Sequence, residues 1–140
     1  VIEQAKKRFD LKKQKTILII EDDESMAHAL EIALHAKDYK TLKASKGHDG
    51  IRMAIGHTPD LIILDIRLPD IEGWQVLSNF KASDKAKNIP VIILTQLNQM
   101  GDINAGFDLG ATGYLTKPLD LHKLYKKITE ILGDCNSALI

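Results

Sequence analysis

The sequence predicts a doubly wound α/β fold, in which a five-stranded parallel sheet carries helices on both faces. Short apolar runs alternate with segments of helical period through most of the 140 residues. The runs are apolar at consecutive positions, a pattern typical of parallel strands that are buried on both sides. With 44% hydrophobic and 27% charged residues, the chain has enough apolar side chains for a single core. We therefore expect one domain.

Five apolar runs are the predicted strands. Helices must cover both sides of runs that are apolar on both faces, which places these runs inside a parallel sheet. The weaker run at 39–44 carries Lys40 and Lys43, which suits a strand at the edge. Crossovers of this length, with an early edge strand, favour the strand order 2-1-3-4-5. The predicted strands are Thr16–Ile20, 39–44, 61–64, 91–94 and 114–115.

The segments between these runs have apolar residues three and four positions apart, which predicts five helices in strict alternation with the strands. The fourth, near 99–109, contains Gly101 and Gly106 and is predicted to be the least stable, since each glycine costs roughly 1 kcal/mol in a helix interior. The other four helices show apolar faces made of Met26, Leu30, Ala33 and Leu34; of Ile51, Ala54 and Ile55; of Val76, Leu77 and Phe80; and of Leu121, Leu124, Tyr125, Ile128, Ile131 and Leu132.

Residues 16–133 are expected to form the domain, with a basic helical tail or linker at 1–15 and a C-terminal tail at 134–140. The first segment is rich in lysine, but Phe9 is its one aromatic residue, so we expect a connector rather than a nucleic-acid partner. The segment also suggests a domain excised from a larger protein, although a stand-alone domain is the alternative.

The setting is expected to be cytoplasmic. Cys135 is the single cysteine, which excludes a disulfide framework and suits a reducing compartment. No apolar run approaches the roughly 20 residues that a membrane-spanning helix needs, so no membrane partner is expected.

Polar side chains stand where four of the predicted strands end. The carboxyl ends of parallel strands meet at one edge of the sheet, so these side chains are expected to lie together around the crevice between strands 1 and 3. Asp23 and Glu24 stand at a predicted helix start and are expected instead to cap it. The residues expected around the crevice are Glu21, Asp22, Asp65, Thr95 and Lys117.

Several carboxylates in one crevice repel one another, so this arrangement calls for a cation among them. Oxygen ligands select a hard ion, and Mg²⁺, with Mn²⁺ as an alternative, takes few carboxylates and bridges to phosphoryl groups. Thr95 and Lys117 would then offer a hydroxyl and a positive charge to phosphoryl oxygens. The pattern therefore predicts phosphoryl transfer to an aspartate.

At these residues the chain resembles the receiver domains of two-component response regulators, which have a flavodoxin-like (βα)5 fold. The resemblance covers roughly residues 16–132. It rests on four motifs in order: EDD after strand 1, D-x-x-x-P with a following Gly, the threonine of strand 4, and Lys-Pro after strand 5. Each motif is weak alone, but the four in this order at strand ends are highly specific.

The resemblance implies a phosphoacceptor and a metal site. Asp65 is the implied phosphoacceptor and also a ligand of Mg²⁺. Asp22 is implied as a direct ligand and Glu21 as a ligand through water. The backbone carbonyl of Arg67 completes the protein's share of the ligands.

The resemblance also implies a switch. Lys117 pairs with the phosphoryl group, Thr95 moves to hydrogen-bond it, and Tyr114 is the aromatic switch residue; the peptide bond between Lys117 and Pro118 is expected to be cis. The implied function is to accept a phosphoryl group from a histidine kinase or a histidine phosphotransfer protein. The response is a change in the surface of helix 4, strand 5 and helix 5, which also suits a homodimer. Such a domain is not a multiple-turnover enzyme.

Two residues depart from the family pattern. Arg67 stands two positions after the implied acceptor, and Gln96 follows Thr95 where the family usually has a small residue. Both long side chains are expected to overhang the site and to slow hydrolysis of an aspartyl phosphate.

Three other functions stay open at this point. A flavin mononucleotide carrier has the same fold, but the acidic stretch EDDES would repel its phosphate. A haloacid-type phosphatase also uses an aspartate at a strand end, but it normally has a second aspartate two residues later, where this chain has Arg67. A pseudo-receiver that only binds partners has no need to keep Asp65, Asp22, Thr95 and Lys117 together.

Overall fold

The structure is a computed structural model that describes residues 14–96 and 109–133. The predicted helix near 99–109 lies almost wholly outside these residues, and so do Cys135 and most of the basic tail. Within the described ranges, no helix is both long enough and apolar enough to cross a membrane.

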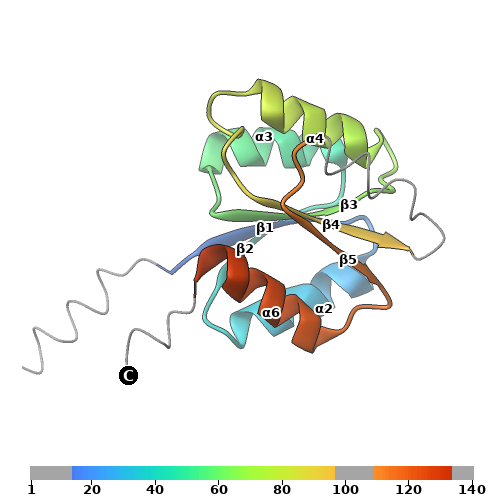
Figure 1. Cartoon of the computed structure of the whole chain (residues 1–140). Helices are drawn as coiled ribbons and strands as arrows, with labels where there is room; N and C mark the ends of the chain where they lie inside the picture. The colour runs from blue at the N-terminus through green and yellow to red at the C-terminus, as the bar shows by residue number, and fades with distance from the viewer. Residues whose placement is uncertain (1–13, 97–108, 134–140) are drawn as a thin grey trace, which may run out of the picture.

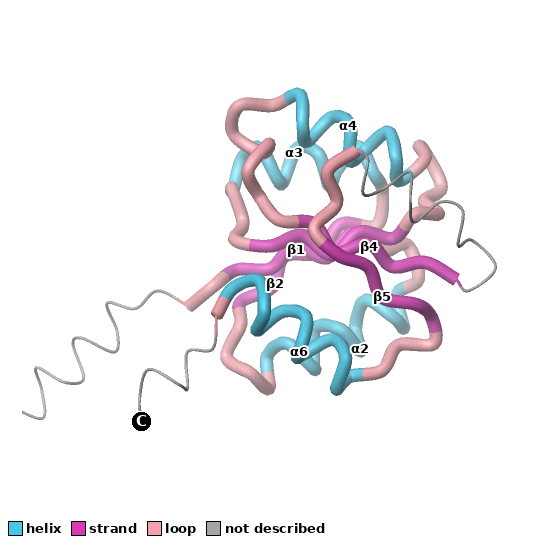
Figure 2. Tube along the Cα trace, viewed as in Figure 1, coloured by secondary structure: helices cyan, strands magenta, loops and turns pink. Residues whose placement is uncertain are grey.

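The five predicted strands form one parallel sheet in the order β2-β1-β3-β4-β5, as expected from the sequence. Figure 2 shows the strands stacked side by side across the middle of the domain. The strand with Lys40 and Lys43 is indeed at one edge. The strands are β1 (Thr16–Ile20), β2 (Lys40–Ala44), β3 (Leu61–Asp65), β4 (Val91–Gln96) and β5 (Gly113–Lys117).

Four helices are described, and they cover both faces of this sheet. Helices α3 (Gly47–His57) and α4 (Gly73–Ala82) lie on one face, and α2 (Glu24–His35) and α6 (Leu121–Leu132) lie on the other (Figure 1). The prediction of a doubly wound, flavodoxin-like fold is confirmed for this part of the chain.

Alternate residues of each central strand point into two separate cores. In β1, Leu18 and Ile20 pack with the α3 and α4 side, whereas Ile17 and Ile19 pack with the α2 and α6 side. All four are completely buried. A strand that is buried on both faces must be apolar at every position, which explains why the central strands are uninterrupted apolar runs.

Three strands extend beyond the predicted bounds, because pairing continues past the last apolar residue. Asp65 still pairs with Leu94, and Thr95 with Thr116. The polar residues at these ends are therefore held by strand backbone. The peptide bond between Lys117 and Pro118 is cis, as the resemblance implies.

Asp23 caps helix α2, which confirms the role expected for it. Its side chain accepts hydrogen bonds from the backbone N–H groups of Ser25 and Met26, at 2.9 and 3.3 Å. Glu24 lies in the first turn of the same helix, where a negative charge is favourable.

Candidate functional site

The predicted site residues come from the carboxyl ends of four strands. Glu21 and Asp22 follow β1 directly, Asp65 ends β3, Thr95 lies near the end of β4, and Lys117 ends β5. All strands run in the same direction, so these ends meet at one edge of the sheet.

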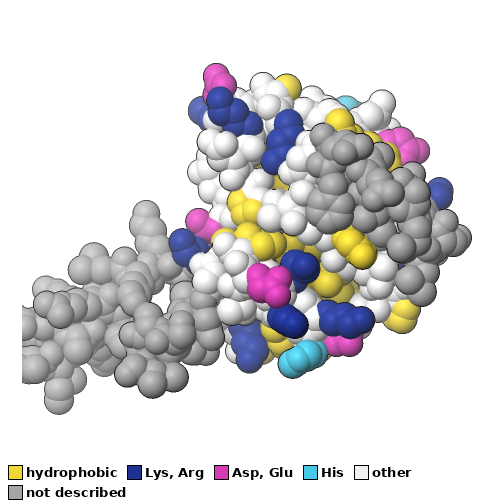
Figure 3. Space-filling model, viewed as in Figure 1, with side chains coloured by type: hydrophobic (Ala, Val, Ile, Leu, Met, Phe, Trp, Pro, Cys, Tyr) yellow, Lys and Arg dark blue, Asp and Glu magenta, His cyan; other side chains and the backbone are white. Residues whose placement is uncertain are grey.

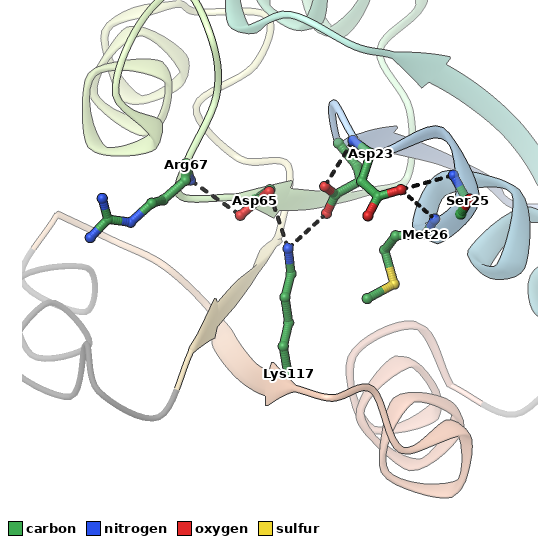
Figure 4. Close-up of polar contacts among 7 residues, drawn as sticks. Asp23, Ser25, Met26, Asp65, Arg67 and Lys117 are labelled. Carbon is green, nitrogen blue, oxygen red and sulfur yellow. Dashed lines mark hydrogen bonds and ion pairs between the residues drawn. The ribbon is translucent and has the colours of Figure 1, made fainter.

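The carboxylate of Asp65 is buried, and both of its oxygens make polar contacts. Its side chain is almost fully buried, with 5% of the residue exposed. Oδ1 accepts a hydrogen bond from the backbone N–H of Arg67 at 3.1 Å, and Oδ2 lies 3.2 Å from Nζ of Lys117. Figure 4 shows Lys117 reaching from β5 toward this carboxylate. The acid is therefore kept in one orientation and beside a positive charge.

Glu21 is the more buried and the less satisfied of the acids, with 3% of the residue exposed. Oε1 accepts a hydrogen bond from the backbone N–H of Asp23 at 3.2 Å. Oε2 lies 3.3 Å from Nζ of Lys117, which makes an ion pair. Apart from this ion pair, Oε2 has no hydrogen-bond partner among the described residues. Burial first, and then the charge of Asp65, raise the pKa of Glu21 to about 7.

Lys117 contributes a positively charged side chain to the site. Burial by itself would lower the pKa of Lys117, but the carboxylates of Asp65 and Glu21 outweigh it, so that its pKa is raised. Lys117 therefore carries a full positive charge at neutral pH and bridges Asp65 and Glu21.

The three acids form a compact oxygen cluster. One carboxylate oxygen from each of Glu21, Asp22 and Asp65 lies within 4.8 Å of the others. The three carboxylates together carry a charge of −3 when ionised. With the +1 charge of Lys117, the net charge of the cluster is then −2. That charge and that set of oxygen donors match a divalent hard cation. Oε2 of Glu21 has an ion pair with Lys117 but no hydrogen bond among the described residues, which is a further sign that the donors suit an ion.

Arg67 enters the site through its backbone rather than its side chain. The backbone N–H of Arg67 donates a hydrogen bond to Asp65. The guanidinium is exposed and points away from the Asp65 carboxylate in Figure 4. The expectation that the Arg67 side chain overhangs the site therefore does not hold in this structure. Gln96 is exposed at the end of β4.

The two predicted switch residues lie on the adjacent strands β4 and β5. Thr95 has 1% of its surface exposed, and its hydroxyl donates to the backbone carbonyl of Gln96 at 3.4 Å, a long bond. Tyr114 is 37% exposed and pairs with Ile93 of β4. The two residues predicted to form the switch thus differ: Thr95 is a buried hydroxyl beside the site, and Tyr114 is an aromatic ring at the surface.

Two aspartates that were not predicted as functional residues, Asp70 and Asp60, accept hydrogen bonds from the backbone of helices or strands far away in the sequence. Asp70 accepts hydrogen bonds from the backbone N–H groups of Gly47 and His48, at the start of α3. Asp60 accepts one from the backbone N–H of Thr16 at 2.8 Å, where β1 begins. The structure shows that the N-cap residue of α3, Lys46, makes no side-chain hydrogen bond to the helix, and nothing local in the sequence points to Asp70 as the substitute.

The comparisons with known proteins agree with this fold and site. The family model of the response regulator receiver domain matches residues 17–129. The DNA-binding dual master transcriptional regulator RpaA of Synechocystis is 37% identical over 116 residues, which are 83% of this chain and 48% of that protein. The chain thus spans about half the length of the curated relatives that it matches.

Solved structures give the same result. A two-component response regulator from Clostridium difficile is 30% identical, with a TM-score of 0.79 over 85% of this chain and 96% of that one. The receiver domain of a sensor histidine kinase from Pseudomonas aeruginosa is 26% identical, with a TM-score of 0.79 over 86% of this chain and 99% of that one. That structure has a magnesium ion coordinated in its active-site cleft.

Fold, site and relatives together define the class. This chain belongs to the receiver domains of response regulators, the signalling domains of two-component systems. Domains of this family work with histidine kinases or phosphotransfer proteins, and a phosphoacceptor role is general among them.

Proposed function

We propose that this chain accepts a phosphoryl group on Asp65 from a phosphohistidine donor, with Mg²⁺, and passes the signal on through a change of surface. The observation that carries the proposal is the contact of Asp65 with Lys117 at 3.2 Å beside two further acids. A buried carboxylate held in this way is unlike a surface acid, and it suits a nucleophile whose charge must be balanced.

Mg²⁺, or Mn²⁺ in its place, would be held by Asp22 and Asp65, by Glu21 through water, and by the backbone carbonyl of Arg67. The donors fit because they are oxygens, and the three carboxylates when ionised leave a net charge of −2 together with Lys117. One donor, Oε2 of Glu21, also has no hydrogen-bond partner in the described part of the chain. When bound, the ion would neutralise charge on the phosphoryl group during transfer. The magnesium in the Pseudomonas aeruginosa receiver domain supports this assignment.

The chain's own groups perform the rest of the transfer. A carboxylate oxygen of Asp65 forms the new P–O bond while the P–N bond to the donor histidine breaks, and the histidine nitrogen leaves with its electron pair. The Lys117 ammonium moves from an ion pair with Asp65 to one with the phosphoryl oxygens, so that the new negative charge stays balanced. Burial of Asp65 excludes bulk water from the acyl phosphate.

The signal is proposed to spread through Thr95 and Tyr114. The Thr95 hydroxyl exchanges its long bond to Gln96 for a bond to the phosphoryl group, and the Tyr114 ring responds on the neighbouring strand. The changed surface consists of the predicted fourth helix near residues 99–109, strand β5, and the predicted fifth helix, which is α6.

The proposed partners are a histidine kinase or a histidine phosphotransfer protein. A homodimer through the same surface is a further proposal, and it requires that the positive charges on this surface be balanced. Figure 3 shows cationic side chains gathered over α6, and Lys123, Lys126 and Lys127 are among the residues that line a shallow hollow between β5 and α6. A symmetric pair would need acidic groups of the second copy against these lysines.

The test is phosphorylation by acetyl phosphate with Mg²⁺, followed by intact-mass analysis. The parent chain is expected to gain one phosphoryl group, and Asp65→Asn none, because the amide is not a nucleophile. Asp38→Asn is the matched control and should be labelled like the parent, because Asp38 is exposed and lies just before β2, at the amino ends of the strands and opposite the site.

Other outcomes would favour the alternatives. Equal labelling of Asp65→Asn and the parent would reject Asp65 as the acceptor. A parent chain that stays unlabelled but binds partners would be a pseudo-receiver, and repeated turnover of a phosphomonoester would indicate a phosphatase. We expect neither, since a receiver domain hydrolyses its own phosphoryl group slowly and is not a multiple-turnover enzyme.

A further inference from the structure

Asp70 lies in the loop between β3 and α4, yet its carboxylate binds the start of α3. Oδ1 accepts a hydrogen bond from the backbone N–H of Gly47 at 2.8 Å, and Oδ2 accepts one from His48 at 3.0 Å. The N-cap residue of α3, Lys46, makes no side-chain hydrogen bond to the first turn. The first N–H groups of a helix need acceptors from outside it, so Asp70 supplies from another loop what a local Ser or Asp usually supplies.

The charge of Asp70 strengthens this contact. A helix N-terminus carries partial positive charge and favours an anion, and hydrogen bonds to a carboxylate are stronger than neutral ones. The bond from His48 first, and that from Gly47, lower the pKa of Asp70 to about 2. Asp70 is therefore an anion at any pH at which the domain would work.

A second contact holds the tip of the same loop. A Cβ atom on Gly47 would lie 2.6 Å from Cγ1 of Ile71, which means that Ile71 packs directly against the backbone of Gly47. Adjacent residues of the loop, one polar and one apolar, thus grip the same first residue of α3. The tip of the loop can move only if one of these contacts breaks or if α3 moves with it.

The base of the loop is closed by backbone contacts. The N–H of Gly73 donates to the carbonyl of Ile66 at 2.8 Å, and a Cβ atom on Gly73 would lie 2.6 Å from the Cα atom of Ile66. Arg67 and Glu72 form an isolated antiparallel bridge above this closure. The loop from residue 66 to residue 73 is therefore a closed unit, pinned at its base by Gly73 and at its tip by α3.

Arg67 lies inside this closed unit, and its backbone faces the site. Its N–H orients the Asp65 carboxylate, and its carbonyl is the proposed backbone ligand of Mg²⁺. Mg²⁺ requires nearly ideal octahedral geometry at about 2.0–2.1 Å, so a small displacement of a backbone ligand weakens binding. Groups that hold a ligand in place can matter nearly as much as the ligand itself.

We propose that Asp70 is a positioning residue of the phosphorylation site: by gripping the N-terminus of α3, it holds the loop of residues 66–73 so that the Arg67 carbonyl is placed for Mg²⁺. The inference rests on the proposed function, because it concerns the same metal site. It goes beyond that function because it gives a role to α3. This helix contributes no residue to the site, but it would support one metal ligand.

The test compares the Mg²⁺ affinity of the parent chain, Asp70→Ala and Asp70→Asn by calorimetry with MgCl₂, at a temperature well below the melting points of all three. Asp70→Ala is expected to bind Mg²⁺ roughly tenfold more weakly, the lower end of what loss of a supporting group costs a metal site. Asp70→Asn keeps one acceptor oxygen and is expected to fall between the two.

Asp60→Ala is the matched control, because it also removes an aspartate that accepts a backbone N–H, but at the opposite end of the strands. It should lower the melting temperature and leave Mg²⁺ affinity unchanged. Asp70→Ala or Asp70→Asn with the Mg²⁺ affinity of the parent would overturn the inference and leave the proposed function intact. A parent chain that binds no Mg²⁺ would overturn both.

Discussion

Glu21 carries a clear electrostatic cost at the level of single residues. It is buried next to Asp65, and one of its oxygens has an ion pair with Lys117 but no hydrogen bond within the described residues. Burial and the charge of Asp65 raise its pKa from 4.5 to about 7. A carboxyl whose pKa is higher in the folded than in the unfolded state binds more protons when folded. Its contribution to stability is therefore complete below pH 4.5 and is lost as the pH rises through 7.

This predicts the stability of Glu21→Gln. Without divalent cations at pH 8, the variant should be more stable than the parent by roughly 2–3 kcal/mol, since it removes a buried charge. At pH 4 the difference should nearly vanish, because Glu21 is then protonated in both states. Urea denaturation at both pH values measures this.

Mg²⁺ supplies the control for this prediction. Saturating Mg²⁺ should stabilise the parent more than the variant, because the parent alone keeps the complete ligand set. The exposed residue Glu130 offers a matched substitution, Glu130→Gln, which should show little change at either pH. An advantage of Glu21→Gln that is the same at pH 4 and pH 8 would contradict a raised pKa.

Helix α3 shows how one element is fitted to the sheet. Gly50 lies on its buried side, where a Cβ atom would approach Cδ1, Cγ1 and Cγ2 of Ile20 to 2.5, 2.9 and 3.1 Å. Ile20 is completely buried at the end of β1, directly before Glu21, and cannot swing away. Gly56 is on the same helix, and a Cβ atom there would meet nothing within 4 Å. The two glycines therefore differ in the space around them.

We predict that alanine has opposite effects at these positions. Alanine gains up to about 1 kcal/mol over glycine in a helix, and at Gly56 nothing opposes this gain. At Gly50 overpacking costs roughly 1–3 kcal/mol, which exceeds the gain, so that Gly50→Ala should be destabilising. Chemical denaturation of both variants is the measurement. Shifts of the same sign would show that helix propensity alone decides both positions.

The two faces of the molecule are connected to the site in different ways. The face with α3 and α4 supports the loop that carries Arg67, whereas β5 provides Lys117 and Tyr114 and leads into α6. The Tyr125 hydroxyl of α6 donates to the carbonyl of Ala33 in α2 at 2.9 Å, which joins the two helices on the other face. A signal from Thr95 should therefore appear first on β5 and α6.

Hydrogen exchange with and without acetyl phosphate tests this at the scale of the whole domain. We predict that exchange changes most in β5, α6 and the predicted fourth helix, and least in α3, because the proposed switch runs through Thr95 and Tyr114. Asp65→Asn treated with the same reagent is the control and should not change. Changes that are confined to residues 26–34 of α2 would refute the proposed path.

The sequence by itself determined the sheet and the chemistry of its edge. Short runs of consecutive apolar residues, set between segments of helical period, indicate strands that are buried on both faces, and parallel strands bring their carboxyl ends together. Those two constraints were enough to place Glu21, Asp22, Asp65 and Lys117 in one cluster, although 52 residues separate Asp65 from Lys117.

Only the tertiary structure decided how these groups are held. The strand ends extend further than the apolar runs, because pairing depends on the neighbouring strand rather than on the residue itself. The raised pKa of Glu21 depends on burial by other elements. The hydrogen bonds that the start of α3 donates to Asp70 join residues far apart in the sequence, and local propensity carries no information about such a contact. The sequence predicted that the Arg67 side chain overhangs the site, whereas in the structure the backbone N–H of Arg67 is the group that contacts Asp65.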